Sequence, residues 1–155
     1  MKRYIFVLLL LAALLCGCGR KAEPSVGVVN PISASSLEAL AAETGYPAER
    51  FAALPELSVR RYNVDPVLFE LEFAHGEVFC TLRLSPGEGQ GDLSGMYFSW
   101  TEEVTGEGYQ IFLDGAGHGI CLWEADGFTW ALSLDEGADD EILTELYIFM
   151  SLISP

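Results

Sequence analysis

The chain has 155 residues and a formal net charge of −15, with 23 Asp and Glu against eight Lys and Arg. Half of its residues are hydrophobic, which supplies enough apolar surface for a folded core and argues against a disordered chain. Nucleic-acid binding needs Lys and Arg side chains that replace counterions on phosphates, so the acidic composition also argues against a nucleic-acid partner.

The N-terminal segment has the pattern of an export signal. A short basic head precedes an apolar run over residues 5–15, which is too short to span a bilayer comfortably. The sequence Leu15-Cys16-Gly17-Cys18 follows and resembles the lipobox of bacterial lipoproteins, in which a Cys is acylated and becomes the new N-terminus. Because Gly17 is small, we expect acylation at Cys18 rather than at Cys16. The alternative is an ordinary secretory signal with an incidental Cys pair.

Cleavage at this site divides the chain into three parts. We expect a signal peptide over residues 1–17, a lipidated Cys18 with a flexible tether over 18–29, and a single domain over 30–155. Cleavage removes two of the eight basic residues and none of the 23 acidic ones, which leaves a net charge of −17. The predicted location is the extracytoplasmic face of the cell membrane, where the lipid holds the domain and anionic headgroups repel it.

A short helix is predicted at the start of the domain. Ser35 and Glu38 have the spacing of a reciprocal capping box, in which each side chain accepts from the other's backbone N–H. Gly45 is suited to the left-handed residue that follows a helix, and Pro47 prevents its continuation. One further helical turn is expected around Phe51.

From residue 57 onward the hydrophobic period changes from helical to two. Residues 67–73 and 78–84 alternate apolar and polar side chains across a Gly-containing turn, which predicts a hairpin. A long Gly-rich loop over 85–95 follows. Further strands are expected at 96–100, 109–113, 118–123 and 128–134, with an acidic turn over 102–108.

The last segment has helical spacing again. Ile142, Leu143, Leu146, Phe149 and Ile153 predict an amphipathic C-terminal helix. The fold class is therefore α+β, with an N-terminal helix, a curved antiparallel meander of six or seven strands, and a C-terminal helix packed on the sheet.

Two cysteines remain besides the anchor, Cys80 and Cys121, and both fall in predicted strands. A disulfide between them is chemically permitted outside the cytoplasm. Buried free thiols are the alternative, and the spacing does not decide between the two.

Several acidic and histidine side chains are candidate metal ligands. Five carboxylates lie within residues 135–141, but their spacing differs from that of a calcium-binding loop. Acidic residues in the first turn of a helix also complement its dipole, and we expect that role here. His75 and His118 are predicted to be solvent-exposed, and nothing in the spacing brings Cys80 or Cys121 to them as zinc ligands. No metal or other cofactor is expected.

Enzymatic activity has little support in the sequence. There is no Gly-x-Ser-x-Gly nucleophile elbow, and Glu102 and Glu103 are adjacent, so on a strand they would point to opposite faces. Arg60 and Arg61 form the one basic doublet of the mature chain outside the tether, suited to an anion or partner contact or to an ordinary exposed strand pair. Seven aromatic side chains could line an apolar pocket, although we expect them to fill the core: Phe69, Phe73, Phe98, Trp100, Trp123, Phe128 and Trp130.

Several segments, taken in order, carry a family resemblance. They are Asn30-Pro31-Ile32, Ser36-Leu37-Glu38, Thr44-Gly45-Tyr46, residues 92–97, Leu122-Trp123, residues 127–133, and Glu136-Gly137 with Glu141. Together they resemble domain-of-unknown-function family 4367, which is found in bacterial lipoproteins and in the outer parts of some membrane proteins related to anti-sigma factors. The family's "GY" after the Pro-rich turn is missing beyond Pro55. The resemblance implies an α+β extracytoplasmic module for sensing or binding, and it supplies no catalytic residues.

The function expected from all of this is a non-enzymatic binding or sensing module, anchored by lipid at the cell envelope. Its partner would be an envelope protein or an apolar ligand. The alternatives are a carrier of a lipid or other hydrophobic solute, whose curved sheet would enclose a cavity, and an unrecognised cell-envelope hydrolase.

Overall fold

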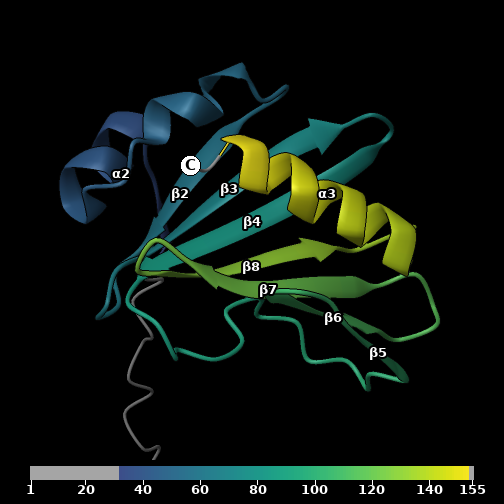
Figure 1. Ribbon diagram of the computed structural model, residues 1–155. Coiled ribbons are helices and arrows are strands. Elements are labelled where there is room, and N and C mark those ends of the chain that lie inside the picture. The colour runs from purple at the N-terminus through teal and green to yellow at the C-terminus, as the bar shows by residue number, and fades with distance from the viewer. Residues whose placement is uncertain (1–31, 154–155) are drawn as a thin grey trace, which may run out of the picture.

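An eight-stranded antiparallel sheet dominates the computed structural model, which describes residues 32–153 (Figure 1). Two α-helices, α2 (Leu37–Thr44) and α3 (Asp140–Ile153), and the 3-10 helix η1 (Ala48–Ala53) lie against the sheet. The strands are β1 (Ile32–Ala34), β2 (Ser58–Tyr62), β3 (Leu68–His75), β4 (Val78–Pro86), β5 (Glu102–Thr105), β6 (Tyr109–Leu113), β7 (Gly119–Ala125) and β8 (Phe128–Leu134). The α+β class and the C-terminal helix are confirmed.

The strands form two meanders rather than one. Their order in the sheet is β1-β2-β3-β4-β8-β7-β6-β5, so the last strand returns to pair with β4 at the centre. Leu82 of β4 lies opposite Leu132 of β8, which joins the two halves into one surface. The predicted single meander of six or seven strands was therefore wrong in both its count and its connection.

Segment 96–100 is not a strand, contrary to the prediction. Its alternating apolar side chains pack on other rings instead of following a ladder of hydrogen bonds: Phe98 stacks on His118, and Trp100 contacts Phe112. The ladder begins two residues later, at β5, where Glu103 lies opposite Phe112. The acidic stretch predicted as a turn thus supplies the edge strand of the sheet, and its charges disfavour edge-to-edge association.

The N-terminal helix lies where the sequence predicted it, with a different cap and a strand before it. Ser35 still belongs to the sheet edge, because its N–H donates to the carbonyl of Val59. Ser36 is the N-cap: its backbone is extended, and its side chain accepts from the N–H of Ala39. Gly45 ends the helix at φ 76°, as predicted.

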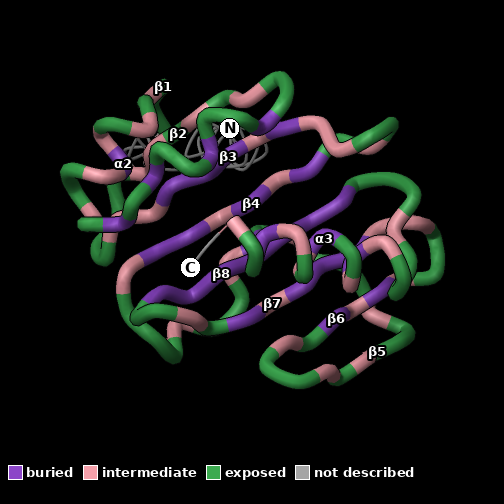
Figure 2. The backbone as a smooth tube through the Cα atoms, turned by 45° about the horizontal axis from the view of Figure 1, so that its top comes forward, coloured by how far each residue is buried: buried purple, intermediate pink, exposed green. Residues whose placement is uncertain are grey.

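The core lies between the sheet and the helices. Figure 2 shows that the buried positions concentrate along β3, β4, β8 and β7. One row of inward-facing side chains crosses six strands in register, namely Val59, Leu71, Leu82, Leu132, Cys121 and Ile111. Leu40 of α2, Phe51 of η1 and Leu143 of α3 are each fully buried in the same core.

Helix α3 begins in the acidic segment. Asp139 accepts from the backbone N–H of Ile142, and Asp140 and Glu141 lie in the first turn. The predicted capping role of these carboxylates is confirmed for this part of the segment. The helix approaches β7 closely at Gly119, where a Cβ would lie 2.8 Å from a side-chain carbon of Leu143. Within residues 32–153 no helix is long and apolar enough to cross a membrane.

Candidate functional site

The predicted acylation site, Cys18, and its tether lie outside the described residues. The two cysteines within residues 32–153, Cys80 and Cys121, are both buried and free. Cys80 is on β4 and Cys121 on β7, with β8 between them, so their Cα atoms are separated by about 10 Å of strand spacing. A disulfide needs these atoms within roughly 7 Å, and the pairing that the sequence left open is not formed. Burial raises the pKa of each thiol to about 12.

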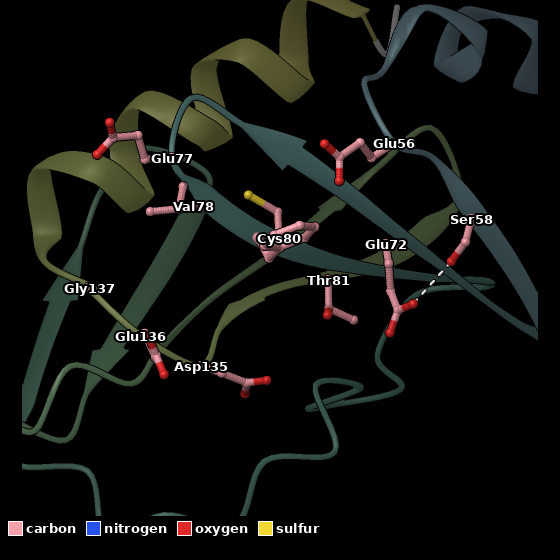
Figure 3. A pocket seen from close by; sticks show the side chains of 11 residues that line it. Glu56, Ser58, Glu72, Glu77, Val78, Cys80, Thr81, Asp135, Glu136 and Gly137 are labelled. Carbon is pink, nitrogen blue, oxygen red and sulfur yellow. Dashed lines mark hydrogen bonds between the residues drawn. The ribbon is translucent and has the colours of Figure 1, made fainter.

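A cleft of about 850 Å³ opens around the start of β4, where Glu72, Phe79 and Thr81 face away from the core and Val78 and Cys80 face toward it. It lies at the end of the sheet where β2 and β4 begin and β8 ends. Figure 3 shows the side chains around it; most of the lining residues are polar, and apolar atoms make up about half of the lining surface. The lining residues are Glu56, Ser58, Glu72, Glu77, Val78, Phe79, Cys80, Thr81, Asp135, Glu136 and Gly137.

Four segments position the carboxylates of this acidic cleft, one of them the β3–β4 turn that carries Glu77. Glu72 lies on β3 and faces outward opposite Thr81 of β4, while Asp135 and Glu136 follow β8 on the other side of β4 (Figure 3). Glu56 belongs to the link between η1 and β2 and has a φ of 54°, a conformation that L-residues seldom adopt. Negative charge therefore surrounds the start of β4 on both sides.

Most of these charges have no cation beside them. Arg60 lies 2.8 Å from the Glu72 carboxylate, and Ser58 donates a hydrogen bond of 3.0 Å to the same oxygen. Within residues 32–153, no ion pair forms at Glu56, Glu77, Asp135 or Glu136. No three acidic, His or Cys groups of the described part converge closely enough to hold a metal ion. The cleft offers a spread negative charge rather than a ligand cage.

Phe79 gives the acidic cleft an apolar surface. Strand alternation turns Cys80 into the core and Phe79 outward, where its side chain is 68 % exposed. Sequence reasoning missed this residue, because the hairpin pattern marked only the inward-facing positions. A Phe among polar residues on the outer face of a predicted strand was the available signal.

The aromatic side chains divide into two groups. Phe69, Phe73, Trp123, Phe128 and Trp130 are buried in the core, as expected. The rings of Trp123 and Trp130 stack with centroids 5.7 Å apart. Phe98 and Trp100 lie on the loop over the outer face, where Phe98 is 40 % exposed. The group therefore does not line one pocket.

Both histidines are partly buried, so the prediction that they are solvent-exposed was wrong. His118 stacks on Phe98 with centroids 4.1 Å apart, and its Nδ1 lies 2.5 Å from the Asp114 carboxylate. Asp114 also accepts from the backbone N–H groups of Ala116 and His118. Desolvation raises the pKa of Asp114, but these hydrogen bonds and His118 outweigh it, so that the pKa is lowered overall. The pair fixes a turn and does not line the acidic cleft.

The second histidine has a weaker acidic neighbour. The Nε2 atom of His75 lies 3.8 Å from a carboxylate oxygen of Glu145, beyond hydrogen-bond range, and its ring packs against Phe149. Neither histidine has the two further N or S ligands that a zinc site requires in the part of the chain that the structure describes.

A buried ion pair holds the long loop on the outer face. Glu70 is 3 % exposed and accepts from Arg83, whose Nη2 lies 2.7 Å away. Arg83 also donates to the carbonyls of Leu93 and Ser94. Gly95 follows at φ 68°, and a Cβ there would lie 2.1 Å from Arg83 Nη1. Residues 92–95, one of the segments of the family resemblance, therefore form a structural turn over Arg83.

The basic doublet is neutralised within the protein. Arg60 contacts Glu70 and Glu72, and Arg61 pairs with Glu43 of α2 at 2.8 Å. These contacts match an internal structural role better than an anion site.

The comparisons with known proteins supply no relative. No protein-family model matches the chain, and no curated protein or solved structure matches it. The resemblance to family 4367 stays a prediction.

Proposed function

We propose that the protein is a lipid-anchored extracytoplasmic binding module, without catalytic activity, that engages an envelope partner through the acidic cleft. The observation that carries the proposal is the cleft itself: about 850 Å³ of open volume, four carboxylates that form no ion pair within residues 32–153, and an exposed Phe79. This volume lies within the roughly 300–1,000 Å³ typical of ligand sites.

The proposed anchor supports this reading through geometry. Acylation at Cys18 would attach the domain through residues 19–29, which span at most about 35 Å when extended. A partner of the acidic cleft would then lie close to the membrane. The negative charge would keep the domain off anionic headgroups, so that the cleft stays available to a partner.

The two alternative functions have less support. A carrier needs an enclosed apolar cavity, whereas the space between sheet and helices holds Trp130, Phe51 and Leu132, each no more than 1 % exposed. A hydrolase needs a nucleophile and base that face one cleft, whereas the contacts of Asp114 and His118 are explained by the turn that they fix.

The test compares two triple variants of equal charge in capture of envelope proteins by the full chain in detergent. Glu77→Gln/Asp135→Asn/Glu136→Gln neutralises the cleft, and Glu102→Gln/Glu103→Gln/Glu107→Gln neutralises exposed carboxylates on and beside β5, at the sheet edge beyond β6. We expect a protein retained by the wild type to be lost from the cleft variant and kept by the control. Equal retention by both variants would refute the role of the cleft.

A further inference from the structure

The acidic cleft combines two features at one place. Phe79 presents an exposed ring at the start of β4, and it lines the cleft together with carboxylates from β3, from the β3–β4 turn and from the segment after β8. An isolated exposed Phe is ordinary, but here it forms the one aromatic part of an acidic lining.

The charge restricts what can bind there. Arg60, Arg61 and Arg83 are already paired with Glu43, Glu70 and Glu72, so they leave the carboxylates of Glu77, Asp135 and Glu136 uncompensated within the described residues. These charges would repel an anionic occupant, and a purely apolar occupant would gain nothing from them. A cationic occupant with an apolar group would satisfy both features together.

We propose, resting on the proposed function, that the acidic cleft takes a basic amphipathic peptide segment of a partner protein. One apolar side chain of that segment packs on Phe79, and flanking Lys or Arg side chains pair with Glu77, Asp135 and Glu136. A single metal ion does not suit the site, because no three ligating groups converge in the described chain.

The ion pairs and the Phe79 contact should affect peptide binding in different ways. Ion pairs at an exposed rim are individually weak and are screened by salt. An aromatic side chain that becomes buried at an interface is a frequent source of large binding losses on truncation. The Lys and Arg contacts therefore set the salt dependence, and Phe79 sets the preference for an apolar side chain.

The test uses the full chain in detergent and three labelled peptides, with binding followed by fluorescence anisotropy. The first peptide combines Lys with two Phe, the second replaces Phe by Ser, and the third replaces Lys by Glu. We expect the Lys/Phe peptide to bind about tenfold more tightly than the Lys/Ser peptide. The Lys/Glu exchange should abolish binding.

Matched variants assign the contacts. Phe79→Ala should weaken the Lys/Phe peptide about tenfold, whereas Tyr97→Ala, which removes a ring that is 97 % exposed elsewhere, should leave the affinity unchanged. The cleft triple variant should weaken binding about tenfold at low salt, and the triple variant at residues 102, 103 and 107 should not.

Three results would overturn the inference: equal affinity for the Lys/Phe and Lys/Ser peptides, equal effects of Phe79→Ala and Tyr97→Ala, or no binding of any peptide. If these occur while envelope capture still depends on the cleft carboxylates, the proposed function stands and only the partner chemistry is wrong. If capture is equal in both triple variants, the proposed function itself fails.

Discussion

Substitution of Arg83 by Met should destabilise the fold through the charge that it leaves behind. Glu70 is 3 % exposed and would keep only Arg60, whose side chain is 45 % exposed, as a cation. Removing one partner of a buried ion pair costs about 3–5 kcal/mol, and the remaining Arg60 places the expected loss near the lower end. Unfolding entropy is roughly 2 cal/mol/K per residue, which over residues 32–153 amounts to about 0.25 kcal/mol/K. A loss of about 3 kcal/mol therefore lowers the Tm by about 12 °C.

The control is the other inter-element Arg pair. Arg61 and Glu43 are both partly exposed, so Arg61→Met should cost no more than about 1 kcal/mol. Urea unfolding of the full chain in detergent, followed by the fluorescence of the buried Trp130, measures both variants. The double variant Glu70→Gln/Arg83→Met should cost less than the sum of its single variants by about 2 kcal/mol, because the uncompensated charge is gone. A loss at Arg83 no larger than that at Arg61, or strictly additive single variants, would show that the pair does not hold the loop.

Two further predictions concern the cysteines. Burial raises the pKa of Cys80 and Cys121 to about 12 against about 9 in the unfolded chain, so the thiols favour the native state below pH 9 and this stabilisation is lost as the pH rises toward 12. The free energy of unfolding should fall as the pH rises from 9 to 12, and it should fall less in the double variant Cys80→Ala/Cys121→Ala. Rapid labelling of both thiols in the native protein would contradict their burial. Cys18→Ala should abolish incorporation of a fatty-acid analogue, whereas Cys16→Ala should not; label retained in the Cys18 variant would exclude that acylation site.

The sequence contained the local elements but not their assembly. The alternation in β3, β4 and β8 was sufficient to predict these strands, and Gly45 was sufficient to predict the end of the first helix. Both signals depend on neighbours only a few residues away. The return of β8 to β4 was not visible, since Thr81 and Ser133 meet across 52 residues. The prediction of a strand at 96–100 was wrong for a related reason. Alternation shows that one side of a segment is apolar, but it does not show whether the backbone has a partner strand.

Part of the acidic cleft could also be predicted from the sequence. The carboxylates of residues 135–141 form a cluster in the sequence, but in the structure they have two roles: Asp139 to Glu141 begin α3, and Asp135 and Glu136 line the cleft. Glu72 reaches the same cleft only because β3, β4 and β8 are neighbours. Without that strand order, sequence reasoning could not bring these carboxylates together with Phe79.

The position of β8 has a consequence for how the protein is made. The strand synthesised last is the one that completes the middle of the sheet, so β4 keeps an unpaired edge until nearly the whole chain is available. Long-range pairings of this kind close slowly, because the loop between them must lose its conformational entropy first. Export before folding, which the proposed lipid anchor implies, would fit this delay, since the half that emerges first cannot complete the sheet. Conversely, a truncation that removes only β8 and α3 would expose two sheet edges at once, and aggregation rather than a smaller folded domain is the outcome that this topology favours.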